Sequence, residues 1–288
     1  MYNVSDPSYH WNGDEVDLDA YLARIGFEGE RTPTPTTLRS LVYLHTTTFP
    51  FENLEILLGR PILLDVDSLQ DKMVRRRRGG YCFESSALFA AVSERLGFGV
   101  TGLSARIFMG ESDKLLAATH AMLRVTAPGD DRIWLCDVGF GSGPLEPIEL
   151  IERDAEFTAG AWRFRLERDA DILGGELWTL RHFNRDGWSV RRTVSMNPQY
   201  RIDYVVGNHY VSTSSHSPFT TRPVLQRMHP EVHYMLDGLT LNTGYPDGTG
   251  ETRELERTEL PKVFTETFDI ELDAAEVAKL LDQPWAAG

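Results

Sequence analysis

Cysteine is scarce in this chain of 288 residues, which contains only Cys82 and Cys136. Because the two do not form a Cys-x-x-Cys pair, a zinc ribbon is excluded, and we expect no disulfide. Hydrophobic runs long enough to cross a bilayer are absent. The first residues have neither a basic region nor an apolar core, so they do not resemble a secretory signal. We therefore expect a cytoplasmic protein without a membrane partner.

Positive charge is also in short supply. The chain has 29 Lys and Arg against 43 Asp and Glu, and its net charge of -14 would repel a phosphate backbone. We therefore expect no nucleic-acid partner. The local exception is the run Arg75 to Arg78. We interpret it as a solvated helix end with one arginine held inward, and the alternative is a site for a small anionic ligand.

The first ninety or so residues have the apolar spacing of helices. Asp17 is expected to cap the first helix, Thr36 or Thr37 the second, and a third is expected to begin near Asp67. A fourth helix is predicted over residues 83–96. This part of the chain therefore predicts a helical unit.

Alternation with a period of two residues follows, and it predicts strands. We expect them over residues 103–107, 121–125, 133–138, 162–168, 177–183 and 188–194. Together they predict a small antiparallel barrel or sheet. The remaining sequence is mixed, with a helix near residues 200–210, a hairpin at Asp237-Gly238 and a last helix that Asp273 opens.

Cys82 is the most informative residue, because it stands directly before the fourth predicted helix in the segment Arg78-Gly79-Gly80-Tyr81-Cys82-Phe83-Glu84. The positive end of the helix dipole and the arginines upstream both favour a thiolate there. A thiolate is a nucleophile, so covalent chemistry is expected at Cys82. The alternative is that Cys82 is a small buried apolar residue.

A nucleophilic cysteine needs a proton acceptor and a third group that orients it. If residues 127–130 form a hairpin loop, His120 faces Asp137 across two strands, with Cβ atoms about 5 Å apart. A slip of one residue would separate the pair. His120 could instead be a core or surface histidine, and Asp137 could simply precede a turn. Cys136 alternates to the face opposite Asp137, so we interpret it as a packing residue.

Several segments occur in the order found in a known family, and most of the chain up to about residue 245 takes part. The segments are Tyr21–Gly26, Pro50–Leu54, Arg78–Glu84, Thr119-His120, Asp137–Gly141 and Ser217–Phe219. On these residues the chain resembles the arylamine N-acetyltransferases in their bacterial form. The last forty residues resemble the family more weakly.

The resemblance implies an α+β fold in three parts with a Cys-His-Asp core like that of cysteine proteases. The parts are an N-terminal helical bundle over residues 1–97 that carries the catalytic cysteine, a central antiparallel β-barrel over residues 98–200 that carries the histidine and aspartate, and a C-terminal α/β lid over residues 201–288. It also implies site residues: Cys82, His120 and Asp137 as the triad, Phe51, Phe140 and Phe219 lining the acceptor pocket, Thr119 beside it, and Arg78 paired with Glu52 beneath the cysteine. Core packing is the alternative for each phenylalanine, and for Arg78 and Glu52 we favour a purely structural ion pair.

The activity that the resemblance implies is ping-pong transfer of an acetyl group from acetyl-CoA to an arylamine or hydrazine, foreign amines included. Acetyl-CoA would be a cosubstrate, and neither a metal nor a bound cofactor is expected. The residues that grip CoA stay unassigned, because Gly139 and Gly141 are more simply turn glycines. Nothing in the sequence indicates the oligomeric state.

Two other functions fit parts of the pattern. A cysteine protease or a transglutaminase-like hydrolase shares the order of cysteine, histidine and aspartate along the chain. A binding protein could hold zinc through Cys82, His120 and Asp137 with one open position.

Overall fold

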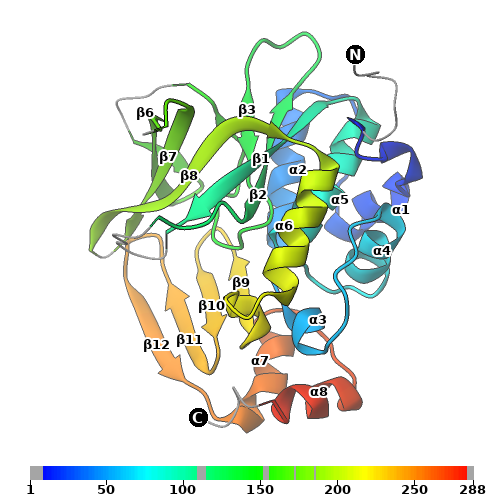
Figure 1. The fold of residues 1–288 in the computed structure, drawn as a ribbon, viewed down its shortest axis with the longest axis vertical. Helices are drawn as coiled ribbons and strands as arrows, with labels where there is room; N and C mark the ends of the chain where they lie inside the picture. Colours follow the sequence, from blue (N-terminus) through cyan, green and yellow to red (C-terminus); the bar gives the residue numbers. More distant parts are fainter. Residues whose placement is uncertain (1–8, 109–114, 152–155, 172, 185, 284–288) are drawn as a thin grey trace.

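The structure is a computed structural model, and it describes residues 9–108, 115–151, 156–171, 173–184 and 186–283. Helices come first along the chain, a large antiparallel sheet follows, and a smaller sheet with two helices comes last (Figure 1). Within the described residues, no helix is long and apolar enough to cross a membrane. The fold is therefore a mixture of helices and antiparallel sheets, as the sequence predicts.

The N-terminal helices surround one long buried helix, α5 (Cys82–Leu96). The surrounding elements are the 3-10 turn η2 (Gly13–Glu15), α1 (Leu18–Ile25), α2 (Pro35–Thr48), α3 (Leu54–Leu57), α4 (Val66–Gln70) and the π-helical turn η3 (Asp71–Arg75). Asp17 caps α1 as predicted, since its carboxylate accepts the N–H of Ala20 at 3.0 Å.

The second predicted helix begins earlier than expected, whereas the third begins near Asp67 as expected but with a different capping residue. Thr34 caps α2, because Pro35 takes the first helical position, where a missing N–H costs nothing. Asp65 caps α4 by accepting the N–H of Ser68 at 2.9 Å, and Asp67 lies inside the helix. In both cases the sequence offered several capping residues, and the prediction chose one too close to the C-terminus.

Helix α5 lies at the centre of the first hydrophobic core, between the other helices and the large sheet. The Ser86 hydroxyl donates to the carbonyl of Ala121 at 3.1 Å and so joins α5 to strand β2. Gly97 ends the helix in the left-handed conformation, with φ of 96°. Cys82 is the first residue of this helix, so a rigid, buried element holds it.

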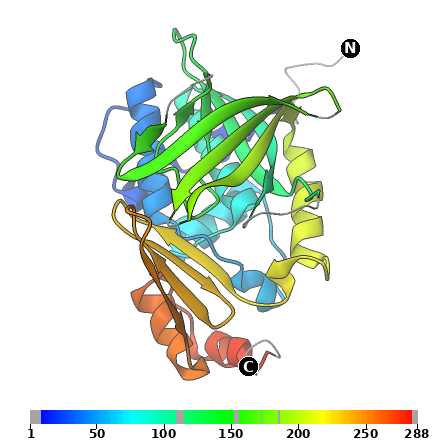
Figure 2. The same ribbon diagram turned by 90° about the vertical axis from the view of Figure 1, so that its left-hand side faces the viewer.

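The large sheet curls over the helices (Figure 2). Its strands are β1 (Gly99–Ile107), β2 (His120–Thr126), β3 (Trp134–Cys136), β4 (Ile148–Glu149), β5 (Phe157–Ala159), β6 (Trp162–Ala170), β7 (Glu176–Asn184) and β8 (Gly187–Gln199). Neighbouring strands are antiparallel in the order β4-β3-β2-β1-β8-β7-β6-β5. The antiparallel sheet that the strand pattern allowed is therefore confirmed, and the β-barrel that the resemblance implied is corrected to an open half-barrel, whose edges are the short strands β4 and β5.

The register between β2 and β3 differs from the predicted one by two residues. The ladder pairs Leu123 with Cys136 and Val125 with Trp134, so the connection is longer than the expected loop. A shift of two residues leaves every side chain on its predicted face. His120 and Asp137 therefore still point to the same side of the sheet.

The C-terminal part begins with one exposed helix and continues as a second sheet. Its elements are α6 (Arg201–Thr213), the 3-10 turn η4 (Pro218–Thr220), β9 (Val224–Met228), β10 (His233–Asp237), β11 (Thr240–Gly244), β12 (Gly250–Glu254), the 3-10 turn η5 (Arg257–Glu259), α7 (Leu260–Glu266) and α8 (Ala274–Leu281). The strand order is β12-β11-β10-β9. Asp273 caps the last helix, as predicted.

Phe51 connects this second sheet to the segment that precedes Cys82. The N–H of Phe51 donates to the carbonyl of Gln226 at 2.8 Å, and the N–H of Gln226 donates back at 3.0 Å. On its other side Phe51 forms a parallel bridge with Gly80. The chain around Phe51 is thus fixed between the cysteine segment and strand β9.

Candidate active site

The structure brings Cys82, His120 and Asp137 together from three separate places in the fold. Cys82 begins α5, His120 begins β2, and Asp137 directly follows β3. The Nε2 atom of His120 lies 3.0 Å from each carboxylate oxygen of Asp137. The Cys82 side chain is an interaction partner of the same imidazole. All three side chains are nearly inaccessible to solvent.

The surroundings of His120 stabilise its charged form. Burial alone disfavours a charged ring, but the charge of Asp137 and the hydrogen bonds to Asp137 and Cys82 raise the pKa of His120 to about 9. At neutral pH the ring is therefore an imidazolium. An imidazolium that touches a thiol is the charge partner that a thiolate requires.

Asp137 has a second cationic partner, Arg192, which the sequence analysis missed. The guanidinium of Arg192 on β8 is fully buried and donates to the Asp137 carboxylate and, at 2.6 Å, to the carbonyl of Gly143. Burial acts to raise the pKa of Asp137, but Arg192 and His120 hold it below its usual range. Asp137 therefore stays ionised behind His120.

One signal in the sequence could have revealed Arg192. It lies two residues before the buried Val194 on β8, so it occupies a position where the alternation places a side chain facing the core. A charged residue at such a position needs a buried partner. Its partner Asp137 lies 55 residues earlier in the chain, which is why no local motif contains both.

The alternative of a zinc site gains no support from this geometry. Across the residues that the structure describes, no group of three or more His, Cys, Asp and Glu side chains is arranged to hold a metal ion. The imidazole of His120 already has Asp137 and Cys82 as partners.

Comparison with known proteins identifies the family. A model of the N-acetyltransferase family matches residues 34–277. The arylamine N-acetyltransferase of Mycolicibacterium smegmatis is 36% identical over 278 residues, which covers 93% of this chain and 99% of that protein. The chain belongs to the arylamine N-acetyltransferase family.

Solved structures of arylamine N-acetyltransferases have the same fold. The enzyme of Nocardia farcinica is 60% identical and superposes with a TM-score of 0.95, covering 98% of this chain and 99% of that one. The enzyme of Mycobacterium marinum, solved in complex with CoA, is 32% identical with a TM-score of 0.83, covering 92% of this chain and 98% of that one.

A cleft of about 430 Å³ opens onto Cys82 and His120. The walls contain all the pocket residues that the N-acetyltransferase resemblance implied, namely Phe51, Thr119, Phe140 and Phe219. The Phe140 ring meets the His120 ring edge-on with centroids 5.2 Å apart, and the Phe51 and Phe219 rings are 5.6 Å apart. The space beside the sulfur is therefore bounded in part by aromatic rings, together with aliphatic and polar side chains.

Thr119 borders this cleft with its backbone carbonyl, and Asn53 holds one wall segment with its side-chain amide. The carbonyl of Thr119 lies 3.8 Å from the Cys82 sulfur. The buried amide of Asn53 donates to the carbonyls of Phe219 and Arg222, each at 2.8 Å, and accepts the N–H of Val224 at 2.8 Å. Asn53 was quoted in the family motif without a role, and these contacts show that it anchors the segment carrying Phe219.

A buried network of ion pairs supports the Cys82 segment from below. Arg78 contacts Glu52 at 3.0 Å and Glu55 at 3.1 Å. Lys72 contacts Glu84 at 2.8 Å, and Glu84 also accepts the N–H of Tyr81 at 3.1 Å. Glu84 thereby fixes the first turn of α5, and its place three residues after Tyr81 is the capping-box spacing.

The other arginines of the run do not reach the sulfur. Arg75 and Arg76 lie at the surface and pair with acidic residues, Arg75 with Asp67 at 2.7 Å and Arg76 with Asp71 at 2.8 Å. None of the residues 75–78 lines the cleft. The interpretation of the run as a solvated helix end with one arginine held inward is confirmed, because Arg75 to Arg77 are exposed and Arg78 is buried. That the run favours the thiolate stays a prediction.

Gly139 is required by a close approach of backbone rather than by a turn. A Cβ atom at residue 139 would lie 2.7 Å from the Cα of Cys82 and 2.9 Å from its carbonyl oxygen. Backbone atoms at the start of a buried helix cannot move aside easily. The loop after Asp137 can therefore pack against Cys82 only if residue 139 has no side chain.

We expect Gly139→Ala to displace Cys82 relative to His120 and to lower the kcat/KM for acetyl transfer by about 100-fold, since displacements near 1 Å have effects of this size. The measurement is acetylation of an arylamine together with the rate at which iodoacetamide alkylates Cys82. The matched control is Gly175→Ala, whose added Cβ would be 3.8 Å from its nearest neighbour. Normal activity in Gly139→Ala would show that this contact does not position the cysteine.

Proposed function

We propose that this chain transfers an acetyl group from acetyl-CoA to the nitrogen of an arylamine or arylhydrazine through a thioester on Cys82. The observation that carries the proposal is the thiol of Cys82 in contact with the His120–Asp137 pair at the wall of an aromatic cleft. The names of the relatives support the reaction, and the CoA complex of the Mycobacterium marinum relative supports the donor. Cys82, His120 and Asp137 would act as the same three groups do in cysteine proteases.

In the first half-reaction the Cys82 thiolate attacks the carbonyl carbon of acetyl-CoA. The backbone N–H groups in the first turn of α5 have no acceptor within the helix, so the N–H of Cys82 is placed to stabilise the oxyanion. The bond from carbon to the CoA sulfur then breaks. CoA leaves as a thiol after taking the proton of the His120 imidazolium, and Cys82 carries the acetyl group.

In the second half-reaction the acceptor amine attacks the Cys82 thioester. The neutral imidazole of His120 accepts the proton that the amine nitrogen loses, while Asp137 holds the ring in place. The bond from carbon to the Cys82 sulfur breaks, so the amide leaves and the thiolate–imidazolium pair is restored. Phe51, Phe140 and Phe219 suit a flat aromatic acceptor and limit the access of water to the thioester.

The division into residues 1–97, 98–200 and 201–288 is part of the same proposal. The first part would supply Cys82, the second His120 and Asp137, and the third Phe219 in the wall of the cleft. The reacting groups would thus meet only when all three parts are assembled.

Arg192 would act as a positioning residue, because it touches Asp137 and not the substrate. Arg192→Met should lower the free energy of unfolding at pH 7 by about 3 kcal/mol, because the Asp137 carboxylate would keep its burial and lose a cation. Because the pKa of Asp137 is lower in the folded chain than in the unfolded chain, its ionised form stabilises the fold at pH values above the ordinary aspartate pKa of about 3.9. This stabilisation is lost as the pH falls through the lowered pKa. The gap between wild type and variant should therefore shrink in acid.

The measurement for Arg192→Met is urea unfolding from pH 7 down to about pH 2, so that the range extends well below the ordinary aspartate pKa. Arg192→Lys is the matched variant, which keeps the positive charge and should recover part of the loss. A gap that stayed constant over this pH range would contradict the assigned link between Arg192 and the ionised Asp137.

The experiment that tests the proposed function separates its two half-reactions. Protein incubated with acetyl-CoA alone should gain one acetyl group on Cys82 and release one equivalent of CoA thiol, seen by intact-protein and peptide mass spectrometry. A panel of arylamines and hydrazides should then remove that group and appear as acetylated products. Peptide cleavage without an acetyl-enzyme would instead support the hydrolase alternative.

A further inference from the structure

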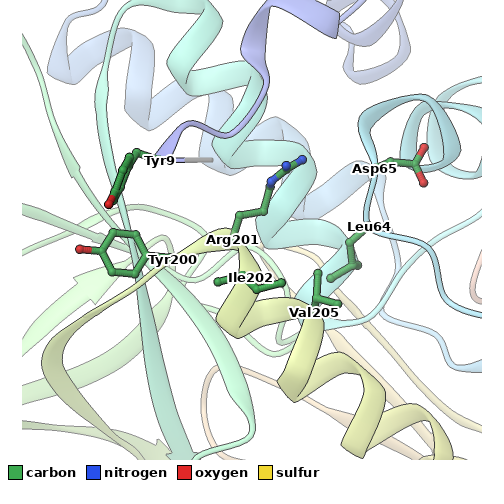
Figure 3. Close-up of a pocket in the computed structure, with 7 residues that line it drawn as sticks. All are labelled: Tyr9, Leu64, Asp65, Tyr200, Arg201, Ile202 and Val205. Atoms are coloured by element: carbon green, nitrogen blue, oxygen red, sulfur yellow. The ribbon is translucent and has the colours of Figure 1, made fainter. Parts of the chain in front are cut away.

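The groove beside helix α6 is separate from the catalytic cleft. It has a volume of about 660 Å³, and its walls mix the charged Arg201 and Asp65 with tyrosine and aliphatic side chains (Figure 3). Among the residues that the structure describes, none lines both this groove and the cleft that opens onto Cys82. Selection among acceptor molecules therefore depends on the side chains of the cleft itself.

The cleft has a polar side for which its aromatic residues do not account. Strands β9 and β10 contribute Val224, Gln226 and Asp237 to its wall, and Arg222 lies just before β9. Arg222 donates two hydrogen bonds to the carboxylate of Asp237, so the charges of these two residues cancel. The amide of Gln226 is therefore the uncompensated polar group that these two strands present to the cleft.

The backbone of Gln226 is fixed on the side of Phe51 away from the cysteine segment. Phe51 forms one bridge with Gly80 and another with Gln226, so the three residues lie side by side. Neighbouring strands lie about 4.8 Å apart, so two such steps put Gln226 about 10 Å from Gly80. A Cβ atom at Gly141 would lie 2.5 Å from the Cβ of Gln226, so the loop after Asp137 packs directly on this residue.

The two ends of the Gln226 amide have different surroundings. Its oxygen, Oε1, accepts a hydrogen bond from Nε2 of His233 at 3.1 Å. Burial and the nearby cation of Arg191 lower the pKa of His233 to about 3, so its ring is neutral at pH 7. The amide nitrogen of Gln226 makes no hydrogen bond within the described part of the chain, and it is still accessible to solvent. Because Gln226 is only 4% exposed and lines the cleft, this N–H₂ group faces the cleft.

We propose that the amide nitrogen of Gln226 contacts the acceptor substrate and selects molecules that carry a carbonyl oxygen on the aromatic ring, para to the reacting amine. The inference rests on the proposed acetyl transfer, because it assigns the far end of the molecule that Cys82 acetylates. Phe51 and Phe140 hold the aromatic ring, and the reacting nitrogen lies at the Cys82 thioester. The carbonyl oxygen then accepts the N–H of Gln226 in place of water.

A hydrogen-bond donor in the wall of a cleft discriminates mainly through what it loses. When a substrate covers the Gln226 amide, the N–H₂ group gives up its water. A substrate with a carbonyl oxygen replaces that water, whereas a hydrocarbon substituent of the same shape leaves the donor without a partner. The amide therefore disfavours acceptors that lack the oxygen more than it favours those that have it.

A purely structural role for Gln226 leads to a different expectation. The backbone of Gln226 exchanges hydrogen bonds with Phe51 whatever side chain residue 226 carries. Damage to this support would slow every acceptor alike. Selection by the amide instead changes the ratio of kcat/KM between acceptors with and without the oxygen, so this ratio is the quantity to measure.

Two acceptors of nearly equal shape test the proposal. They are para-aminoacetophenone and para-isopropylaniline, which carry an acetyl and an isopropyl group at the same ring position. In Gln226→Leu the ratio of kcat/KM for the ketone to that for the hydrocarbon should fall about 10-fold from the wild-type ratio, because one hydrogen bond is lost. Comparison of ratios cancels the different reactivities of the two amines. The matched control is Gln199→Leu, at the end of β8 and outside the cleft, which should keep the wild-type ratio.

Gln226→Glu tests which atom of the amide faces the cleft. A carboxylate has no N–H to donate, so the ratio should fall at least as far as it does in Gln226→Leu. His233→Leu tests the anchor of the amide. It removes the donor that holds Oε1, so the amide is less well oriented and the ratio should fall by a smaller factor.

A wild-type ratio in Gln226→Leu would overturn the proposal, whether both acceptors react normally or both slow equally. A ratio that survives in Gln226→Glu would also overturn it, because the group facing the cleft would then be an acceptor. Failure of acetyl transfer is a separate result. Calorimetric binding of the two amines to the unacetylated protein would still show whether Gln226→Leu changes their relative affinity, and an unchanged relative affinity would refute the role of Gln226.

Discussion

Replacing Cys82 with serine should abolish acetyl transfer while leaving the fold intact. The change is nearly isosteric at a site that is 3% exposed, so thermal unfolding should be unaltered. A serine hydroxyl does not form an ion pair with the His120 imidazolium at neutral pH, so the nucleophile is lost. We expect kcat/KM for an arylamine to fall by at least about 10⁴-fold, as it does when other covalent nucleophiles are removed. The measurement is release of CoA thiol, with intact mass to detect the acetyl-enzyme.

Cys136→Ala is the control for this prediction. Cys136 is fully buried, and burial raises the pKa of its thiol, so it stays protonated and unreactive. The control should form the acetyl-enzyme as the wild type does. Turnover that survives in Cys82→Ser but fails in Cys136→Ala would place the covalent step on the other cysteine.

Alternation along the strands was sufficient to predict that His120 and Asp137 share one face of the sheet. The pairing of His120 with Asp137 was predicted with a register that is wrong by two residues, yet both side chains lie on the expected face. Alternation along a strand fixes the face of each residue, whereas the length of a hairpin loop depends on contacts that alternation does not record. The face was therefore predictable, and the register was not.

The features that were not predictable depend on segments distant in the sequence. Arg192 reaches Asp137 from β8, and Asn53 holds the segment of Phe219 from the other end of the chain. Gly139 was interpreted as a turn residue, because its contact with the Cys82 backbone exists only after the loop packs against α5. The strand pattern left the choice between a barrel and a sheet open for a similar reason, since alternation does not record whether the two edge strands pair.

Replacing Asp137 with asparagine should have the second-largest effect, because it removes the charge that keeps His120 protonated. Burial of the ring would then dominate and lower the pKa of His120 from about 9 towards or below its ordinary value of about 6.5. The asparagine amide also offers a single neutral acceptor oxygen, whereas the carboxylate accepts from both His120 and Arg192. We expect kcat/KM to fall by about 10⁴-fold, as when the aspartate of a similar triad becomes asparagine.

Alkylation of Cys82 by iodoacetamide across pH measures the charge state of the pair. In the wild type the imidazolium persists up to pH of about 9, so alkylation of Cys82 should be fast at pH 7. In Asp137→Asn the same reaction should be slower at pH 7, because Cys82 loses its imidazolium partner. Asp130→Asn is the control, because Asp130 belongs to the connection between β2 and β3 and pairs with Arg132 at the surface.

The stability of Asp137→Asn supplies an independent check with a definite sign. A histidine whose folded pKa is raised to about 9 stabilises the fold fully below its unfolded value of about 6.5, and this contribution is lost as pH rises through about 9. The difference in unfolding free energy between wild type and Asp137→Asn contains a part that depends on His120. This part should shrink as the pH rises from about 6.5 to about 9. The loss of the partner of Arg192 adds an offset that does not change over this range, because arginine stays charged. A gap that widened with pH would contradict an imidazolium–carboxylate pair at this site.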